Sequence, residues 1–247
     1  MTASKKEMVQ KMSIRSNIEE ITARKNAAAE RSGRKGDDVL LVAVTKLHDC
    51  DEINEAISCG ITDIAENKVQ EIRNKYEKVD PSVRWHLIGH LQTNKVKYII
   101  DKVVMIHSVE SLHLAKEIDK RAAQHGVTMD ILIQVNSAEE ESKFGITVDE
   151  TEQLIHDILD NCPNVRIRGL MCIAPWEDNP EDAKVYFEMV KKQFDQFANI
   201  DHPNLDFKYL SMGMTNDFEV AIEAGSNLIR VGTAIFGNRD YSRKMGE

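Results

Sequence analysis

One lysine is placed where its amine could act as a nucleophile. The run from Val39 to Lys46 is apolar and rich in β-branched residues, and it breaks at Leu47-His48-Asp49. This pattern predicts a buried strand with the lysine at its end, on the same side as every second aliphatic residue of the run. Apolar surroundings disfavour a charged amine, so they lower its pKa and let it condense with a carbonyl. The alternative is a strand-end lysine whose ammonium simply reaches water.

Two turns near the end of the chain could bind a phosphate. One is Ser211-Met212-Gly213-Met214-Thr215, and the other is Gly232-Thr233. Backbone N–H groups freed by the glycines, together with the hydroxyls of Ser211, Thr215 and Thr233, could surround a phosphate dianion. The alternative is that these are ordinary turn glycines and helix caps.

Arg230 lies inside the apolar run Leu228-Ile229-Arg230-Val231, where a buried guanidinium needs a partner. It could pair with a carboxylate such as Glu66, or it could face a ring nitrogen of a ligand. Arginine does not lose its proton in proteins, so it would keep a facing pyridine nitrogen unprotonated and weaken the ring as an electron sink.

An amine, a phosphate-binding turn and a ring-facing arginine together describe a site for pyridoxal 5′-phosphate (PLP). In this hypothesis Lys46 carries PLP as a Schiff base and the turns after the last strands hold its phosphate. Asn67, at the end of the second predicted strand, could donate or accept a hydrogen bond at the ring hydroxyl.

These residues come together only if the strands that carry them end at one face. A leading helix, predicted at about residues 5–31, ends at the polar segment Ser32–Gly36. Short apolar runs then alternate with amphipathic segments. The predicted strands are Val39–Lys46, Thr62–Asn67, Val83–Gly89, Val103–Val109, Met129–Asn136, Val165–Ile173, Phe207–Met212 and Leu228–Phe236. The predicted helices between them include Asp51–Ser58, Leu112–Gln124, Glu150–Leu159, Pro180–Ala198 and Asp217–Ala224.

About eight βα units after one extra N-terminal helix predict an α/β protein, a single (β/α)₈ TIM barrel at about residues 38–240. The first strand is not followed by the glycine fingerprint of a dinucleotide-binding open sheet. The absence of a Pro/Gly/Ser-rich linker favours one domain over residues 1–247. In such a barrel the strand ends form the site, and phosphate sites commonly follow strands seven and eight.

Composition excludes several classes of function. The net charge of −9 argues against nucleic acid or an anionic membrane surface as a partner. The four cysteines form no C-x-x-C pair, so no metal site is expected. No apolar run approaches the ~20 residues needed to cross a bilayer, and Met1 to Met12 lacks the apolar centre of a secretory signal. We therefore expect a cytoplasmic protein with reduced thiols.

From Ile14 to Tyr241 the chain resembles the YggS/PROSC family of pyridoxal phosphate homeostasis proteins. The matching blocks occur in order along the sequence. They are Leu41-Val42-Ala43-Val44-Thr45-Lys46, Glu66-Asn67-Lys68-Val69-Gln70-Glu71, the segment from Trp85 to Lys95, Ile106-His107-Ser108-Val109, Lys143-Phe144-Gly145, Arg168-Gly169-Leu170-Met171, Leu210-Ser211-Met212-Gly213-Met214-Thr215 and the segment from Arg230 to Gly237.

The resemblance implies a barrel related to the N-terminal domain of alanine racemase, with PLP covalently bound to Lys46. It implies that Ser211, Gly232 and Thr233 bind the phosphate and that Arg230 approaches the pyridine nitrogen. It further implies a monomer that holds PLP without turnover and hands it transiently to apo PLP-dependent enzymes.

The chain departs from the family pattern at three places. The family usually has Phe-Gly-Glu-Asn-Tyr where this chain has Ile64-Ala65-Glu66-Asn67-Lys68, which could alter ring packing. Thr215 replaces the usual serine and keeps a hydroxyl, and His90 stands where many members have another residue.

The alternative function is that of a PLP-dependent amino-acid racemase or a related enzyme. Racemization needs a second acid/base on the face opposite the lysine, because one base returns the proton to the side that it left. In the racemases that group is a tyrosine from an additional β domain, and only Asn238 to Glu247 follow the last predicted strand here. The remaining candidates for this acid/base are His86, His90 and His107, although a strand-end histidine is more often structural.

Overall fold

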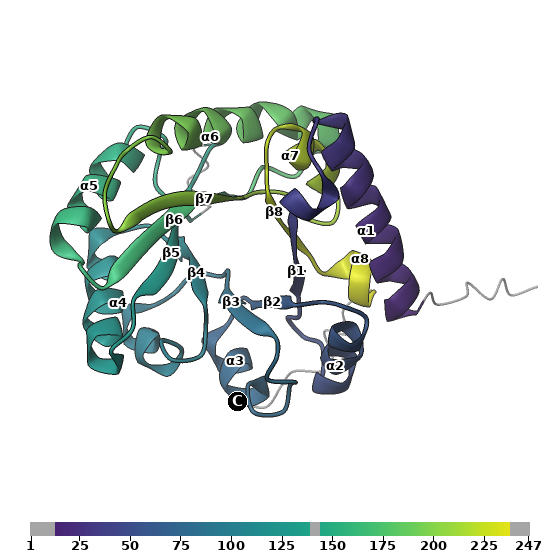
Figure 1. Ribbon diagram of the computed structural model, residues 1–247, viewed down its shortest axis with the longest axis horizontal. Helices are drawn as coiled ribbons and strands as arrows, with labels where there is room; N and C mark the ends of the chain where they lie inside the picture. Colours follow the sequence, from purple (N-terminus) through teal and green to yellow (C-terminus); the bar gives the residue numbers. More distant parts are fainter. Residues whose placement is uncertain (1–12, 139–143, 238–247) are drawn as a thin grey trace, which may run out of the picture.

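Eight parallel strands close into a barrel in the order of the sequence, as Figure 1 shows for the computed structural model. The structure describes residues 13–138 and 144–237. The strands are β1 (Leu40–Val44), β2 (Asp63–Glu66), β3 (Arg84–Leu87), β4 (Met105–Val109), β5 (Met129–Val135), β6 (Val165–Cys172), β7 (Leu205–Ser211) and β8 (Leu228–Val231). The predicted (β/α)₈ barrel is confirmed.

Helices surround the barrel (Figure 1). They are α1 (Ile14–Arg31), α2 (Cys50–Ser58), α3 (Val69–Lys75), α4 (Leu112–His125), α5 (Thr151–Asn161), α6 (Lys184–Phe197), α7 (Phe218–Glu223) and α8 (Thr233–Phe236). Three 3₁₀ segments add to these: η1 (Gly36–Asp38), η2 (Thr93–Tyr98) and η3 (Pro180–Ala183). None of the helices within 13–138 and 144–237 is long and apolar enough to cross a membrane.

The predicted N-terminal helix is confirmed as α1, which begins after Ser13, whose hydroxyl accepts a hydrogen bond from the Ser16 N–H (3.2 Å). Helix α1 contacts α2, α7 and α8 and so fills the outer ring beside the four-residue α8. The Asn17 side chain joins the two helices by donating to the Ile235 carbonyl oxygen (2.7 Å). The predicted helical residues before Ser13, the Lys143 of the Lys143-Phe144-Gly145 block and the barrel residues predicted after Gly237 lie outside the described residues.

One predicted strand is wrong over half of its length. The run Leu228–Phe236 is strand only to Val231, and after Gly232 it turns into α8. The strand half and the residues Ile235 and Phe236 of the helical half are buried, and an apolar run alone does not distinguish a strand from a short helix. The helical half packs outward, where the Phe236 ring stacks on His48 with centroids 4.6 Å apart.

The barrel has two kinds of core. The larger core lies between the strands and the helices and is built from outward-facing residues such as Ile64, Leu87 and Ile229. Inside the barrel, the apolar residues form two smaller clusters around Val42 and Leu132. The rest of the barrel interior includes buried polar side chains, and one of them, Arg230, reaches the site described below.

Candidate functional site

A cavity of about 590 Å³ opens among the loops that follow β1, β2, β6, β7 and β8. Six of the seven residues predicted for the site line it, and they come from four different strand ends. They are Lys46, Asn67, Thr215, Arg230, Gly232 and Thr233. Because parallel strands end at one face of a barrel, residues as far apart in the chain as Lys46 and Thr233 meet here.

Lys46 lies in a turn rather than at the end of a strand. Strand β1 ends at Val44, and the chain turns through Thr45, Lys46 and Leu47. Leu47 has a φ of 67°, the one positive value at a non-glycine residue in the described part of the chain. Such a backbone costs about 1 kcal/mol or more and persists only where neighbours hold it. The predicted lowering of the Lys46 pKa stays a prediction.

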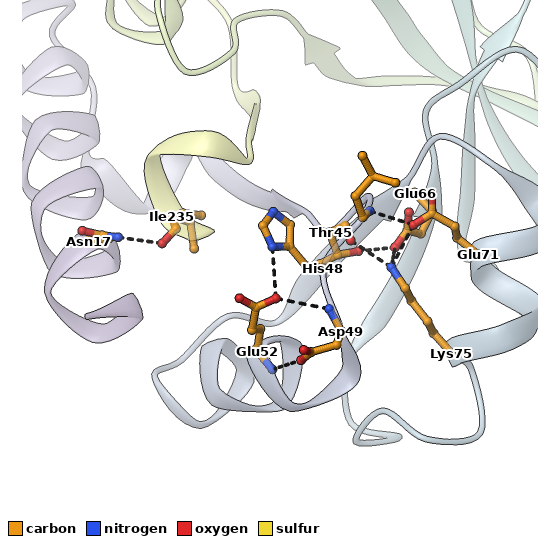
Figure 2. A network of polar contacts seen from close by, with 10 residues as sticks. Asn17, Thr45, His48, Asp49, Glu52, Glu66, Glu71, Lys75 and Ile235 are labelled. Carbon is orange, nitrogen blue, oxygen red and sulfur yellow. Dashed lines mark hydrogen bonds and ion pairs between the residues drawn. The ribbon is translucent and has the colours of Figure 1, made fainter. Parts of the chain in front are cut away.

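A buried cluster of charged residues holds this turn on both sides of Lys46 (Figure 2). The Glu66 carboxylate accepts hydrogen bonds from the Thr45 hydroxyl (2.7 Å) and from Lys75 Nζ (2.7 Å). Lys75 Nζ also donates to the Thr45 carbonyl oxygen (2.9 Å) and to Glu71 Oε2 (3.0 Å). The Leu47 N–H donates to the same Glu71 oxygen (2.8 Å). The residues before and after Lys46 are therefore both fixed to helix α3.

The pKa values of the two carboxyl groups of this cluster are shifted in opposite directions. Burial raises the pKa of Glu66 to about 7, and the Lys75 ammonium opposes that rise. Burial also acts to raise the pKa of Glu71, but hydrogen bonds from Leu47 and Lys75 outweigh it, and the pKa falls below its usual value. The sequence did not point to this cluster. A Glu-to-Lys spacing of four on α3 was the available signal, and it is common on exposed helices.

Arg230 projects into the barrel and reaches the cavity wall. Its side chain donates to the Ser211 hydroxyl and to the Cys172 carbonyl oxygen (2.9 Å). Burial lowers the pKa of this guanidinium from its ordinary value. The possibility that Arg230 pairs with Glu66 is wrong, because Glu66 faces outward to Lys75. An arginine has five N–H donors, so some remain for a ligand.

The turns after β7 and β8 form the second wall. Gly213 has a φ of 93°, and a Cβ there would lie 2.7 Å from the Ala221 side chain and 2.9 Å from the Phe218 Cα, so the turn requires glycine. Asp217, which sequence reasoning missed as a site residue, closes the turn by accepting a hydrogen bond from the Met214 N–H (2.6 Å). Burial raises the pKa of Asp217. At Gly232 the chain enters α8, whose first N–H groups have no acceptor within the helix.

Ser211 and the three candidate histidines do not line the cavity. Ser211 is fully buried, and its predicted direct contact with phosphate stays a prediction. His86 and His107 are buried in the barrel interior and contact each other (3.0 Å). His90 lies on the surface, where it pairs with Glu110 (3.0 Å). Within 13–138 and 144–237, the acid/base groups that line the cavity, besides Lys46, are Asp217 and Glu177.

The cavity wall retains unused hydrogen-bonding capacity at Asn67. Its Oδ1 atom is buried and has no hydrogen-bond partner among the residues that the structure describes. Buried polar atoms are nearly always paired, so this amide fits a wall completed by a polar ligand. The described residues contain no cluster of His, Cys, Asp or Glu that could hold a metal ion.

Substituting Gly89 by alanine is expected to displace Asn67. A Cβ at Gly89 would lie 2.2 Å from the Asn67 carbonyl oxygen, which must move. We expect a stability loss of about 2 kcal/mol in urea denaturation and a large shift of the Asn67 amide in NMR spectra. Gly169→Ala, whose Cβ would clash with the Tyr209 carbonyl at the β6–β7 pair, is the matched control and should lose stability while the Asn67 signals stay in place. An unmoved Asn67 in Gly89→Ala would contradict the prediction.

Comparison with known proteins places the chain in a family. Residues 16–240 match the model of the alanine racemase N-terminal domain. The chain is 41% identical over 225 residues to the pyridoxal phosphate homeostasis protein of Aquifex aeolicus, covering 91% of this chain and 97% of that protein. It is 36% identical over 238 residues to the protein of the same name from Escherichia coli K12, covering 94% and 99%.

Among solved structures, the chain is similar to PipY of Synechococcus elongatus with PLP bound. The two share 31% identity with a TM-score of 0.72, over 88% of this chain and 100% of PipY. The family model extends over the whole described barrel and so includes the strand ends that form the cavity. The chain therefore belongs to the alanine racemase N-terminal domain family, among the relatives named pyridoxal phosphate homeostasis proteins.

Proposed function

We propose that this protein binds PLP in the cavity at the strand ends and holds it for delivery to apo PLP-dependent enzymes. The observation that carries the proposal is the meeting of Lys46, Arg230 and the Gly232–Thr233 turn in one cavity. The names of the relatives and the PLP bound to PipY support the choice of ligand.

Each residue has a proposed role towards PLP. Lys46 Nζ forms the covalent link. Thr215, Gly232 and Thr233 bind the phosphate, whose charge suits free N–H groups and hydroxyls. Asn67 bonds the ring hydroxyl and Arg230 faces the ring nitrogen. When bound, PLP supplies an electron-accepting ring.

The proposed function has no catalytic turnover, for two physical reasons. A guanidinium keeps its proton, so Arg230 leaves the ring nitrogen unprotonated and weakens the ring as an electron sink. The three histidines considered for racemization do not line the cavity. Among the described residues, the alternative, a racemase or related enzyme, would have Asp217 or Glu177 as its second acid/base, and Asp217 already holds the Met214 N–H.

Two measurements on PLP-loaded protein test the function. Mixed with the apo form of a PLP-dependent enzyme, the loaded protein is expected to restore its activity, and free PLP at the same concentration is the reference. Incubated with single amino-acid enantiomers in D₂O, it is expected to leave chirality and α-protons unchanged. Sustained α-proton exchange or racemization at micromolar protein concentration would show that the protein is an enzyme and not a carrier. We further propose that the protein is a monomer, and light scattering of the purified protein measures its mass in solution.

A further inference from the structure

A row of five buried polar side chains crosses the barrel interior and ends at the cavity. In this interior row, Asp63 Oδ1 lies 2.8 Å from His86 Nε2, and His86 Nδ1 lies 3.0 Å from His107 Nε2. His107 Nδ1 lies 3.2 Å from the Ser211 hydroxyl, to which Arg230 donates from Nη1. Each contact joins neighbouring or facing strands, so the row links β2, β3, β4, β7 and β8.

The interior row is buried at every position. Asp63, His107 and Ser211 have no exposed surface, and His86 and Arg230 are 2% and 3% exposed. An unpaired polar group at such a place costs about 1–3 kcal/mol. A row of this kind persists only where each donor meets an acceptor, and here each consecutive pair does.

The two ends of the row and the partners of the Ser211 hydroxyl together indicate one direction for its hydrogen bonds. Arginine can only donate, so the Ser211 oxygen accepts from Arg230. Among the described residues, the other hydrogen-bond partner of this hydroxyl is His107 Nδ1, so we assign the hydroxyl hydrogen to His107. His107 then carries its proton on Nε2 and donates to His86 Nδ1. His86 in turn carries its proton on Nε2 and donates to Asp63, which as a carboxylate can only accept.

The charge states agree with this direction. Burial lowers the pKa of His107 well below its ordinary value, and the neighbouring Arg230 guanidinium adds to the effect, so His107 is neutral. Burial acts to raise the pKa of Asp63, but hydrogen bonds from His86 and from Arg84 outweigh it and keep the carboxyl ionised. Arg84 closes the far end of the row at 2.7 Å from Asp63 Oδ2.

We propose that the interior row positions Arg230 towards the bound ligand, with His107 and Ser211 as positioning residues. Within the barrel, Arg230 donates one Nη1–H to the Ser211 hydroxyl and one Nη2–H to the Cys172 carbonyl oxygen. Arg230 also lines the cavity, so its remaining N–H groups are available to a ligand there, and the ring nitrogen of PLP would accept one. This inference rests on the proposed function for its ligand, and it assigns Ser211 a role through Arg230 in place of a phosphate contact.

Ser211→Ala and His107→Leu test the row in the PLP-loaded protein. Ser211→Ala removes the acceptor of the Arg230 Nη1–H, and His107→Leu removes the partner that orients the Ser211 hydroxyl towards Arg230. We therefore expect PLP affinity to fall on the order of tenfold in each variant, the effect of one charge-assisted hydrogen bond. The absorbance maximum of bound PLP should shift, because it reports on the partner of the ring nitrogen. His107→Gln, whose amide can both accept and donate, should restore much of the wild-type spectrum.

Ser226→Ala is the matched control. Ser226 is fully buried in the loop before β8, and its hydroxyl contacts only backbone carbonyl oxygens, those of Leu210, Met212 and Leu228. Its loss should lower stability without moving the PLP spectrum. If Ser211→Ala and His107→Leu have the same PLP affinity and spectrum as Ser226→Ala, the positioning role is overturned.

A measurement without PLP separates this inference from the proposed function. In ¹⁵N NMR spectra of the apo-protein, His86 and His107 are both expected as neutral rings protonated on Nε2. A ring protonated on Nδ1 at either position would overturn the direction of the row and with it the proposal. Failure of the wild-type protein to bind PLP at all would instead refute the proposed function and leave the expected tautomers unaffected.

Discussion

Replacing Lys46 by alanine is expected to abolish covalent attachment of PLP. In the proposed site the covalent link uses the Lys46 amine, and alanine offers no nitrogen that could replace it. The wild-type protein, loaded with equimolar PLP and reduced with borohydride, should carry one pyridoxyl group on the peptide that contains Lys46. The Lys46→Ala protein should carry none and should lack the absorbance band of the covalent adduct. The barrel should remain folded, because Lys46 is only half-buried and lies in a turn.

Lys68→Ala provides the control for this experiment. Lys68 is an exposed lysine next to the cavity residue Asn67, but it lines a separate, smaller pocket. Its loss should leave the mass shift and the absorbance band unchanged. A pyridoxyl group found on another lysine of the Lys46→Ala protein, at the same yield as in wild type, would show that the assignment of Lys46 is wrong.

The barrel and most of the site could be predicted because both depend on local pattern. Apolar runs separated by amphipathic segments specify strand and helix order, and the barrel then brings the strand ends together. Lys46, Asn67 and Arg230 could therefore be assigned to one site although they are far apart in sequence, and the structure places them in one cavity. The roles of these residues towards PLP stay proposals.

The sequence alone could not predict which partners the buried polar groups have. Arg230 needed a partner, but whether this was Glu66 or Ser211 depends on which way each side chain faces. Glu66 faces outward to α3, and Ser211 faces inward. The buried contacts of His107 were hidden for the same reason, because they join strands whose pairing order is fixed only when the barrel closes.

Replacing Lys75 by methionine is expected to cost about 3–5 kcal/mol of stability, the largest loss we expect from one substitution in this protein. Lys75 is 2% exposed and its ammonium contacts the carboxylates of both Glu66 and Glu71, themselves 0% and 6% exposed. Methionine fills a similar volume but leaves these carboxylates without a cation. Urea denaturation of the two proteins measures the loss. Lys78→Met, at an exposed lysine that follows α3, should change stability by no more than about 0.5 kcal/mol.

The loss should depend on pH in a predictable direction. Burial already raises the pKa of Glu66 to about 7, and without the Lys75 ammonium, which opposes this, it should rise further. A carboxyl whose pKa is higher in the folded than in the unfolded protein destabilises the fold increasingly as pH rises between those two values. The deficit of Lys75→Met should therefore be larger at pH 8 than at pH 5. A deficit that is equal at both values would mean that the lost packing of the lysine stem, rather than unpaired charge, causes it.

Adding Glu66→Gln to Lys75→Met should recover part of the lost stability, because a neutral amide does not require the ammonium and still accepts the Thr45 hydroxyl. The double variant also connects this cluster to the ligand. Lys75 and Glu71 fix the residues on either side of Lys46, so Lys75→Met should slow covalent PLP attachment even under conditions where the protein is fully folded. The double variant keeps the Thr45 contact but not that of the ammonium, so its attachment rate should lie between those of wild type and Lys75→Met. A wild-type rate in Lys75→Met would show that the Lys46 turn does not need the cluster.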